Sequence, residues 1–481
     1  MKTAIVWFRR DLRLTDNPAF TAALSCAEWI VPVYIHSPHE ESPWPPGAAS
    51  RWWLYHSLTA LDLSLRERGA CLIIRQGDSL RELVRLVEEV RAEGVFWNRL
   101  YEPQAIARDR QIKAALRETG LCAESHNAAL LFEPWQVKTR AGEPYRVFTP
   151  FWRSCSQLLA ALPAALTAPD CISMPRGVFE GFSLAGLDLL PRVSWDLGFH
   201  ELWQPGETSA LVRLEKFCAE GLAGYQKGRD RPDRASTSRL SPHLHFGEIS
   251  PRQVLAEVNR CVRENTQPGI LSGAEVFLRE LGWREFAHHL LYHFPETTDS
   301  PFDPRFSGYP WVEDASALRS WQRGETGIPL VDAGMRELWQ TGWMHNRVRM
   351  VVASFLTKNL RIHWREGARW FWDTLVDADL ANNALGWQWT AGCGAVAAPY
   401  FRIFNPVLQA ERYDVNRDYI RRWIPEVAAL PDKYVHRPWT TPKSILDLIN
   451  LRLGRDYPSP ITDLQSGREA ALAGYRQIQV S

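Results

Sequence analysis

Thr3-Ala-Ile-Val-Trp-Phe8 is a continuous apolar run with the length of one buried β-strand, and it opens a repeating pattern. Four further apolar runs follow it, at residues 30–35, 71–75, 95–98 and 122–125. The stretches between them, notably 52–68, 80–92 and 105–117, repeat apolar residues every three or four positions, as amphipathic helices do. Strands that alternate with helices predict a doubly wound parallel sheet, so we expect an α/β domain over residues 1–130. Ligands of such sheets bind at the carboxyl ends of the strands.

The pattern changes after this first domain. Residues 131–207 are expected to form an interdomain connection, because the regular spacing fades after about residue 155 and five prolines follow by residue 205. From residue 208 to residue 481 helical spacing dominates, most clearly at 277–294, 330–339, 344–360 and 368–375. The predicted architecture is therefore an α/β N-terminal domain followed by an all-α C-terminal domain.

The composition excludes several classes of protein. The chain is 45% hydrophobic and 23% charged, which is typical of a folded globular protein. A formal net charge of +1 means that any DNA binding would have to come from a local basic patch. Eight cysteines without a CxxC pair argue against a zinc ribbon or a disulfide-rich secreted module. We therefore expect a cytoplasmic protein with reduced thiols, without a targeting signal or a membrane span.

A cationic, hydroxyl-rich segment runs from Tyr225 to Ser241. It contains Arg229, Arg231, Arg234 and Arg239 and ends on Thr237-Ser-Arg-Leu-Ser241 before an expected helix. Hydroxyls, backbone N–H groups and a guanidinium at one turn suit a pyrophosphate. The alternative is a solvated loop, which is the commoner meaning of such a charge run.

A second segment, Phe277-Leu-Arg-Glu-Leu-Gly-Trp-Arg-Glu-Phe286, has helical spacing. Glu280, Trp283 and Arg284 would share one face, which brings a carboxylate, an indole and a guanidinium together. Gly282 is unfavourable in a helix interior, so we expect another group to approach the backbone there. A salt-bridged amphipathic helix remains the alternative.

Two more segments place polar side chains among apolar ones. In Thr341-Gly-Trp-Met-His-Asn-Arg-Val-Arg-Met350, Asn346, Arg349 and Met350 share a helical face on which an amide could read a base edge. In the segment that begins at Asp377, the side chains of Asp379, Asn383 and Trp387 would form a helical stripe. The two aspartates lack a His or Cys cluster, so no metal site is expected, and a helix N-cap followed by core aromatics is the alternative.

Together, and in this order after an α/β domain, the four segments resemble the photolyase/cryptochrome family. The resemblance extends from Val6-Trp-Phe-Arg-Arg-Asp-Leu-Arg-Leu14 to Ala398-Pro-Tyr-Phe-Arg-Ile-Phe-Asn-Pro406 and on toward Trp423. It implies flavin adenine dinucleotide (FAD) in the helical domain. The residues that would hold its phosphates and the rest of the cofactor are Tyr225, Thr237, Ser238, Arg239, Leu240 and Ser241, with Arg284, Asp377 and Asp379 at the isoalloxazine and ribose. Asn383 matches the residue that faces the flavin N5 atom.

The resemblance also implies a reaction and a substrate. Light-excited reduced FAD would pass an electron to a cyclobutane pyrimidine dimer flipped out of DNA, which would split the dimer in a carbon–carbon lyase reaction. Trp283 and Trp389 would wall the dimer, Glu280 and Asn346 would read it, Met350 would line its pocket, and Arg229 and Arg347 would meet DNA phosphates. Trp387, Trp364 and Trp311 align with the tryptophan chain that reduces the flavin from the surface. Trp311 is assigned by its ten-residue spacing to Trp321, so a neighbouring Trp could take its place.

Several finer expectations follow. Relatives that act on (6-4) photoproducts carry His at the positions of Asn346 and Met350, so dimer repair is favoured here. Phe277 stands at a position that is Trp in some relatives, and Val396 stands where an Asp is expected, so a bond near the Asn383 helix would be missing. We expect an antenna chromophore, methenyltetrahydrofolate rather than a deazaflavin, near Asn98 and Glu102, and a monomer without an obligate protein partner.

Two other functions compete with this interpretation. A cryptochrome would have the same fold and cofactor and would signal in blue light without repair, but signalling members often carry long C-terminal tails. A nucleotide-binding α/β protein with a helical partner-binding domain would explain the first 130 residues only. It does not explain why Trp283, Asn346, Asn383 and Trp387 occur together.

Overall fold

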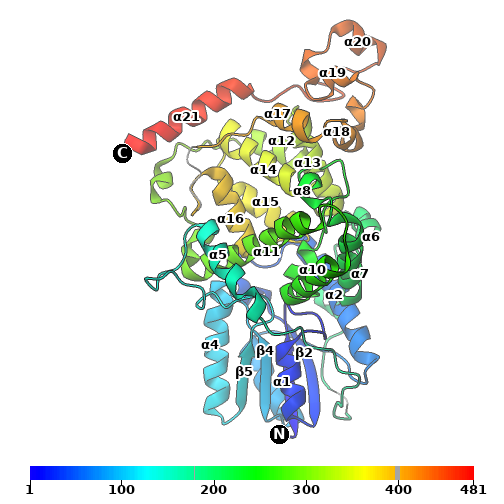
Figure 1. Ribbon diagram of the computed structural model, residues 1–481, viewed down its shortest axis with the longest axis vertical. Helices are drawn as coiled ribbons and strands as arrows, with labels where there is room; N and C mark the ends of the chain where they lie inside the picture. Colours follow the sequence, from blue (N-terminus) through cyan, green and yellow to red (C-terminus); the bar gives the residue numbers. More distant parts are fainter. Residues whose placement is uncertain (178, 396–400, 481) are drawn as a thin grey trace.

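The computed structural model describes residues 1–177, 179–395 and 401–480. Its N-terminal part is a five-stranded parallel sheet in the order β3-β2-β1-β4-β5, seen at the lower end of Figure 1. The strands are β1 (Thr3–Phe8), β2 (Trp29–His36), β3 (Ile73–Gln76), β4 (Gly94–Asn98) and β5 (Cys122–His126). All five predicted strands are confirmed, and the α/β interpretation of this part of the chain is correct.

The sheet is covered on both faces, which explains the continuous apolar runs of its strands. The helices that cover it are α1 (Pro18–Cys26), α2 (Ala48–Arg66), α3 (Ser79–Val90) and α4 (Pro103–Glu118). Ile5 and Trp7 of β1 pack into a core with α3 and α4, whereas Val6 and Phe8 pack into a core with α1 and α2. Successive side chains of a strand point to opposite faces, so β1 needs apolar residues on both faces, which Ala4–Phe8 supply.

The remainder of the chain is helical. Its longer helices are α5 (Phe148–Leu158), α7 (Glu207–Lys216), α10 (Pro251–Glu264), α11 (Ile270–His293), α12 (Ala315–Arg323), α13 (Pro329–Thr341), α14 (Asn346–Ser354), α15 (Trp364–Thr374), α16 (Leu380–Ala391), α17 (Pro406–Tyr413) and α21 (Leu464–Val480). The short ones are α6 (Leu197–Leu202), α8 (Tyr225–Gly228), α9 (Ser241–His245), α18 (Asp418–Trp423), α19 (Asp432–Val435) and α20 (Lys443–Leu448). The run predicted at 344–360 is α14 followed by a single π-helical turn over Phe355–Asn359.

The connection between the two parts contributes to the helical core. Within the expected connection, α5 packs beside α11, and the Trp152 ring crosses α11 at Gly282. A Cβ at Gly282 would lie 2.4 Å from that ring, so the close approach expected at this glycine is confirmed. The position therefore requires glycine for packing.

The sheet and the helices share a continuous interface. The buried Arg13 donates to the carbonyl of Gly247 at 2.7 Å and to that of Ala128 at 2.9 Å. Gly247 has a φ of +66°, and a Cβ there would lie 2.2 Å from the Arg10 carbonyl. The turn after α9 is thereby held against the carboxyl end of β1. No helix in the described part of the chain is long and apolar enough to cross a membrane.

Candidate active site

The centre of the candidate site is the carboxylate of Asp377, just before α16. It accepts hydrogen bonds from Arg349 of α14 at 2.8 and 3.1 Å and from the Ser241 hydroxyl at 2.6 Å. The hydroxyl-rich segment, α14 and the segment before α16 therefore meet at one buried carboxylate. The resemblance to the photolyase/cryptochrome family assigned Arg284 to this region, but the guanidinium that binds Asp377 belongs to Arg349.

Arg284 lies elsewhere at the edge of this centre. Its guanidinium donates to the carbonyls of Ala129 at 2.7 Å and Leu244 at 3.5 Å. The position ties α11 to the chain that follows β5 and to α9. Its predicted contact with a cofactor stays a prediction.

Asp379 caps α16 and faces two histidines. Its Oδ1 accepts the backbone N–H of Asn382 at 2.9 Å, while Oδ2 lies 3.4 Å from His245 Nδ1 and 3.5 Å from His288 Nε2. Burial alone would raise the pKa of Asp379, but His288 and His245 hold that pKa well below its usual range. The helix cap considered from the sequence is confirmed, and it places a charged carboxylate beside the site.

Asn383 and Trp387 follow Asp379 at one-turn intervals along α16, so the predicted stripe is confirmed. The Asn383 amide donates to the carbonyl of Ala368 at 3.0 Å, and within the described residues its side-chain oxygen has no partner. The Trp387 ring lies against Gly367 of α15, where a Cβ would come within 2.0 Å of it. The stripe thus places the half-buried Asn383 amide one turn before a buried indole.

The segment 237–241 surrounds the same centre. Arg239 has a φ of +51°, and its guanidinium lies 4.8 Å from the centroid of the Trp343 ring. The Trp343 indole N–H reaches the Ser241 hydroxyl at 3.3 Å. Thr237 and Ser238 are half-buried beside it, and Leu240 is buried. Tyr225 begins α8 and packs against Phe277 with ring centroids 5.4 Å apart.

A second group of predicted residues meets through the adjacent residues Arg229 and Asp230. Arg229 forms an ion pair with Glu280 of α11, while Asp230 forms one with Arg347 of α14 at 2.9 Å. The Arg347 guanidinium also lies 4.5 Å from the centroid of the Tyr413 ring. Sequence reasoning named Arg229, Glu280 and Arg347 but missed Asp230, because the pairing joins positions more than a hundred residues apart.

The remaining substrate candidates lie on α11, α14 and α16. The Trp283 indole is half-buried and stacks on Phe148 of α5, which the sequence analysis did not single out. Asn346 is exposed at the first turn of α14, and Met350 is half-buried one turn later. Trp389 lies 6.3 Å from the Phe404 ring, measured between centroids. The structure brings Glu280 and Trp283 together on α11, and Asn346, Arg347 and Met350 on α14.

His345 holds the start of α14. Its Nδ1 accepts the backbone N–H of Arg347 at 3.2 Å, and burial lowers the pKa of His345 to about 4. The imidazole is therefore neutral at physiological pH and fixes the first turn that carries Asn346.

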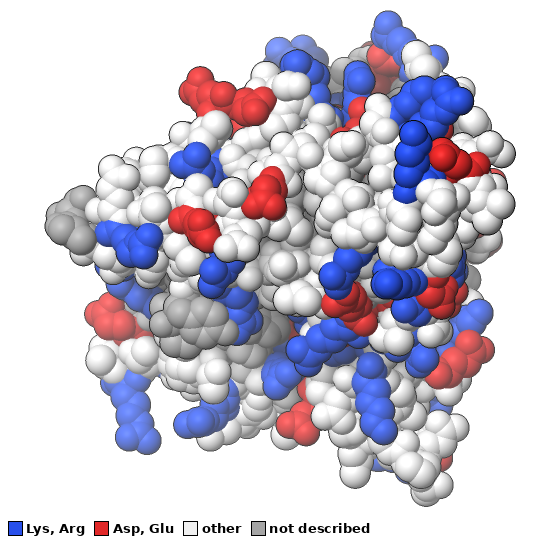
Figure 2. All heavy atoms as spheres, turned by 90° about the horizontal axis from the view of Figure 1, so that it is seen from above, with Lys and Arg blue, Asp and Glu red and all other residues white. Residues whose placement is uncertain are grey.

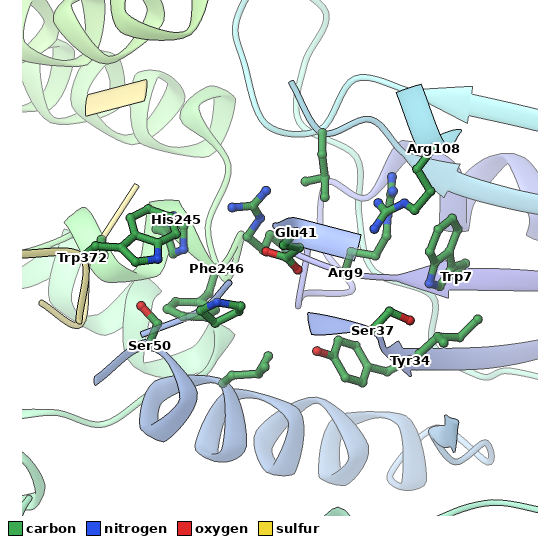
Figure 3. A pocket seen from close by; sticks show the side chains of 16 residues that line it. Trp7, Arg9, Tyr34, Ser37, Glu41, Ser50, Arg108, His245, Phe246 and Trp372 are labelled. Atoms are coloured by element: carbon green, nitrogen blue, oxygen red, sulfur yellow. The ribbon is translucent and has the colours of Figure 1, made fainter. Parts of the chain in front are cut away.

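A cavity of about 650 Å³, including its open mouth, lies between the carboxyl ends of β1 and β2 and the helical part (Figure 3). Three arginines line it, Arg9, Arg10 and Arg108, together with Glu41 and the aromatic rings of Trp7, Tyr34 and Trp372. The guanidinium groups of Arg9 and Arg108 both approach the Trp7 ring, at 4.4 and 5.1 Å from its centroid. Within the described residues the buried indole N–H of Trp7 has no partner. Such a cavity suits a planar, partly anionic ligand.

The two predicted antenna residues lie outside the wall of this cavity. Asn98 is buried, and its amide donates to Asp11 and Asn17 at 2.6 Å each while its oxygen accepts from the Ala19 N–H at 3.2 Å. Glu102 binds Arg10 at 2.6 Å and so positions a residue that does line the cavity. Val396, a further residue of interest, lies outside the described residues.

The surface near these elements carries charges of both signs. Figure 2 looks down on the helical end of the molecule and shows Lys and Arg spread across it, with Asp and Glu scattered between them. One surface group of possible metal ligands, His39, Glu40 and Asp78, occurs in the described ranges. Glu40 already accepts from the Ser79 N–H and hydroxyl, so this group does not change the expectation of no metal site.

Comparisons with known proteins agree with this geometry. Residues 4–170 match the family model described as DNA photolyase, and residues 277–477 match the model described as the FAD binding domain of DNA photolyase. The chain is 46% identical to a deoxyribodipyrimidine photo-lyase of Agrobacterium fabrum, over 100% of this chain and 99% of that protein. It is 39% identical to cryptochrome-1 of Arabidopsis thaliana, over 97% of this chain and 69% of that protein.

The crystal structure of a bacterial class III photolyase from Agrobacterium tumefaciens superposes with a TM-score of 0.95 at 45% identity, covering 100% of this chain and 98% of that one. A cryptochrome of Synechocystis superposes with a TM-score of 0.91 at 29% identity, covering 98% and 99%. Sequence and structure together therefore show that the chain belongs to the DNA photolyase family.

Proposed function

We propose that the protein repairs cyclobutane pyrimidine dimers in DNA in a light-driven reaction, with reduced FAD as the electron donor. The observation that carries the proposal is the convergence described above. Arg229 and Asp230 join Glu280 of α11 to Arg347 of α14, and α14 also supplies Arg349 to the Asp377 carboxylate. Family membership and the relatives named deoxyribodipyrimidine photo-lyase support the same reaction.

The residues present fit FAD. Thr237, Ser238, Arg239 and Ser241 offer the hydroxyls and the cation that a pyrophosphate needs. Asp377 and Asp379 offer buried carboxylates for hydroxyl or N–H groups, and the side-chain oxygen of the half-buried Asn383 can accept from a ring N–H. When bound, FAD supplies a light-excitable electron donor, while the protein supplies binding, orientation and electrostatics. Tyr225, Leu240 and Arg284 would complete its surroundings.

The protein's part in the reaction is to hold a flipped-out dimer close to the cofactor. A dimer has apolar faces and polar imide edges, so it needs aromatic walls and a few hydrogen-bonding groups. Trp283, Met350 and Trp389 would supply apolar contact, Glu280 and Asn346 would bind the polar edges, and Arg229 and Arg347 would bind DNA phosphates. No general base is required, because transfer of one electron to the dimer opens its cyclobutane ring.

The same residues favour dimers over (6-4) photoproducts. Repair of the latter needs a proton donor, which relatives supply from His at the positions of Asn346 and Met350. An amide and a thioether cannot replace an imidazolium as proton donors at neutral pH. His345 is adjacent in sequence, but it is buried and neutral and its Nδ1 is used to cap α14.

The cavity of Figure 3 is a candidate for an antenna chromophore. We infer methenyltetrahydrofolate in preference to a deazaflavin. A pterin edge donates N–H groups that the Glu41 carboxylate can accept, and a glutamate tail is an anion that Arg9, Arg10 or Arg108 can bind. Glu102 would act by holding Arg10, and Asn98 by holding the end of β4 against the turn after β1.

We further infer that damaged DNA is the only partner required and that the protein acts as a cytoplasmic monomer. All eight cysteines are free thiols, as the cytoplasm allows. Gel filtration with light scattering would test the oligomeric state.

The proposal is tested by binding in the dark followed by illumination. Purified, reduced protein is titrated with duplexes that carry a thymine dimer, a (6-4) photoproduct or no lesion, at fixed salt. We expect tightest binding to the dimer and repair of the dimer alone in blue light. Bound flavin with neither dimer preference nor repair would favour the cryptochrome-type signalling function, and absence of flavin would contradict both.

A further inference from the structure

An imidazole ring lies between two of the tryptophans assigned to electron supply. The His363 ring centroid is 5.6 Å from that of Trp364 and 4.9 Å from that of Trp311. Within the described residues, no ring pairing joins Trp311 to Trp364 directly. His363 is therefore the aromatic group that connects them.

The surrounding backbone holds this arrangement. His363 is the N-cap of α15, and its Nδ1 accepts the backbone N–H of Arg365 at 3.1 Å. On the other side, the N–H of Val312 donates to the carbonyl of Arg361 at 2.8 Å, which fixes the segment that carries Trp311. Both the imidazole and the indole thus have a backbone anchor next to them.

The cap also decides where the imidazole carries its proton. Because Nδ1 accepts a hydrogen bond, the neutral ring carries its proton on Nε2, and protonation would break the cap. Burial, together with Arg365 and Arg369, lowers the pKa of His363 to about 4. Arg361 and Glu366 lie within three residues of it along the chain, and Tyr309 contacts Trp311. The ring is uncharged at physiological pH.

His363 extends an aromatic path from the core to the surface. At the inner end, Trp387 crosses α15 at Gly367, one turn from the fully buried Trp364. At the outer end, Trp311 is half-buried and lies 4.5 Å from the ring of Tyr309. The Trp387 ring pairs with those of Trp321 and Phe371, at 6.1 and 5.0 Å between centroids. Among the described rings, His363 contacts both Trp364 and Trp311.

We propose that His363 is a positioning residue for flavin reduction, whose uncharged ring couples Trp364 to Trp311. The inference rests on the proposed function, because it needs a flavin that takes electrons from Trp387. For each electron that Trp387 gives up, Trp364 refills Trp387 and Trp311 refills Trp364. A thiol in solution refills Trp311, and two thiols that each lose one electron and one proton join as a disulfide. No bond to His363 forms or breaks.

A charged ring at this position would oppose the transfer. The electron vacancy on an indole is positive, and an imidazolium in contact with both indoles would raise the energy of a vacancy on either one. The cap to Arg365 thus has an electronic consequence as well as a structural one.

Two substitutions separate the ring from the cap. His363→Asn keeps an efficient helix cap and removes the ring, whereas His363→Phe keeps a ring and removes the cap. With the holoenzyme and a thiol donor, we expect His363→Asn to lower the rate of light-driven flavin reduction several-fold, with a melting temperature close to that of the parent. His363→Phe should lose thermal stability but stay close to the parental rate.

The readouts distinguish this inference from the repair function. Both His363 variants, reduced chemically with dithionite, should repair thymine dimers at the parental rate. If the parent itself repairs no dimer, the proposed function is contradicted, and not the role of His363. Transient absorption should show fewer long-lived tryptophan radicals in His363→Asn. A parental rate of photoreduction in His363→Asn, with Trp311→Phe impaired, would overturn the role of His363. A parental rate in both His363→Asn and Trp311→Phe would overturn the route through Trp311, and the inference with it.

Discussion

The Trp283 indole stacks on the Phe148 ring with centroids 3.7 Å apart and planes 8° from parallel. Phe148 is buried, and the Trp152 ring lies nearly parallel on it at 6.5 Å, so α5 presents a layered aromatic support to α11. One face of the proposed dimer wall is therefore fixed by a helix from the interdomain connection.

Replacing Phe148 by Leu should weaken dimer binding without removing Trp283. Aromatic stacking is worth about 0.5–1.5 kcal/mol beyond area burial, which corresponds to a rise in Kd of about two- to tenfold. The measurement is a titration with a dimer-containing duplex and an undamaged duplex. An equal loss of affinity for both duplexes would contradict the assignment, because the stack would then support DNA binding in general.

Asp230 forms an ion pair with Arg347, whose guanidinium is proposed to bind a DNA phosphate. Asp230→Asn should increase affinity for damaged and undamaged DNA, because Arg347 loses a competing anion and the surface loses a negative charge. A half-exposed pair of this kind is worth up to about 1 kcal/mol, so we expect an increase of at most about fivefold. Glu264→Gln is a charge-matched control, because among the residues that the structure describes Glu264 pairs with Arg260 of α10 alone. An equal gain in DNA affinity in Glu264→Gln would mean that the change in net charge is the cause, and not the loss of the ion pair with Arg347.

Gly367 leaves room for the Trp387 ring. A Cβ at this position would lie 2.0 Å from that ring, so Gly367→Ala should displace the indole and destabilise the fold by about 1–3 kcal/mol. It should also slow flavin photoreduction. Gly386→Ala is the matched control, because no atom of the described residues lies within 4 Å of the Cβ that it adds and alanine favours a helix. Chemical unfolding and photoreduction rates check both, and parental behaviour of Gly367→Ala would contradict this packing.

The buried carboxyl of Glu337 should make stability depend on pH. Burial raises the pKa of Glu337 to about 7, although Tyr419 donates to its Oε2 at 2.6 Å. The folded state then binds more protons than the unfolded chain between about pH 4 and pH 7, so this group's contribution to stability falls as pH rises through that window.

Glu337→Gln removes the ionisable group and keeps an oxygen that can accept from Tyr419. Relative to the parent, the variant should gain stability as pH rises, by up to about 3 kcal/mol above pH 7. Urea unfolding at several pH values measures the difference. A difference that does not change with pH would mean that Glu337 titrates normally in the fold.

Local patterns in the sequence were enough to predict much of the fold. Each strand of the sheet is buried on both faces, so it appears as an apolar run, and the flanking helices carry their own spacing. The stripe of Asp379, Asn383 and Trp387 depends only on helical geometry, and Gly282, which is unfavourable in a helix interior, indicated the approach of another group. Each of these features can be recognised from about ten consecutive residues of the sequence.

The parts that could not be predicted join distant segments. Nothing close to Asp377 in the sequence indicates that Arg349 will bind it, and nothing close to Arg347 in the sequence indicates that it will pair with Asp230. The stacking of Phe148 on Trp283 and the place of His363 between two indoles likewise depend on how helices pack. Arg349 was visible on the same helical face as Asn346, which was the one available signal for its role.

Repair itself is the most direct test of the account. A thymine-dimer oligonucleotide is mixed with the chemically reduced protein, and recovery of intact thymines is followed in blue light and in the dark. We predict recovery in light only, with Glu280→Gln and Trp283→Ala slower than the parent at limiting substrate. A protein that binds and photoreduces its flavin but restores no thymine in light would contradict the account.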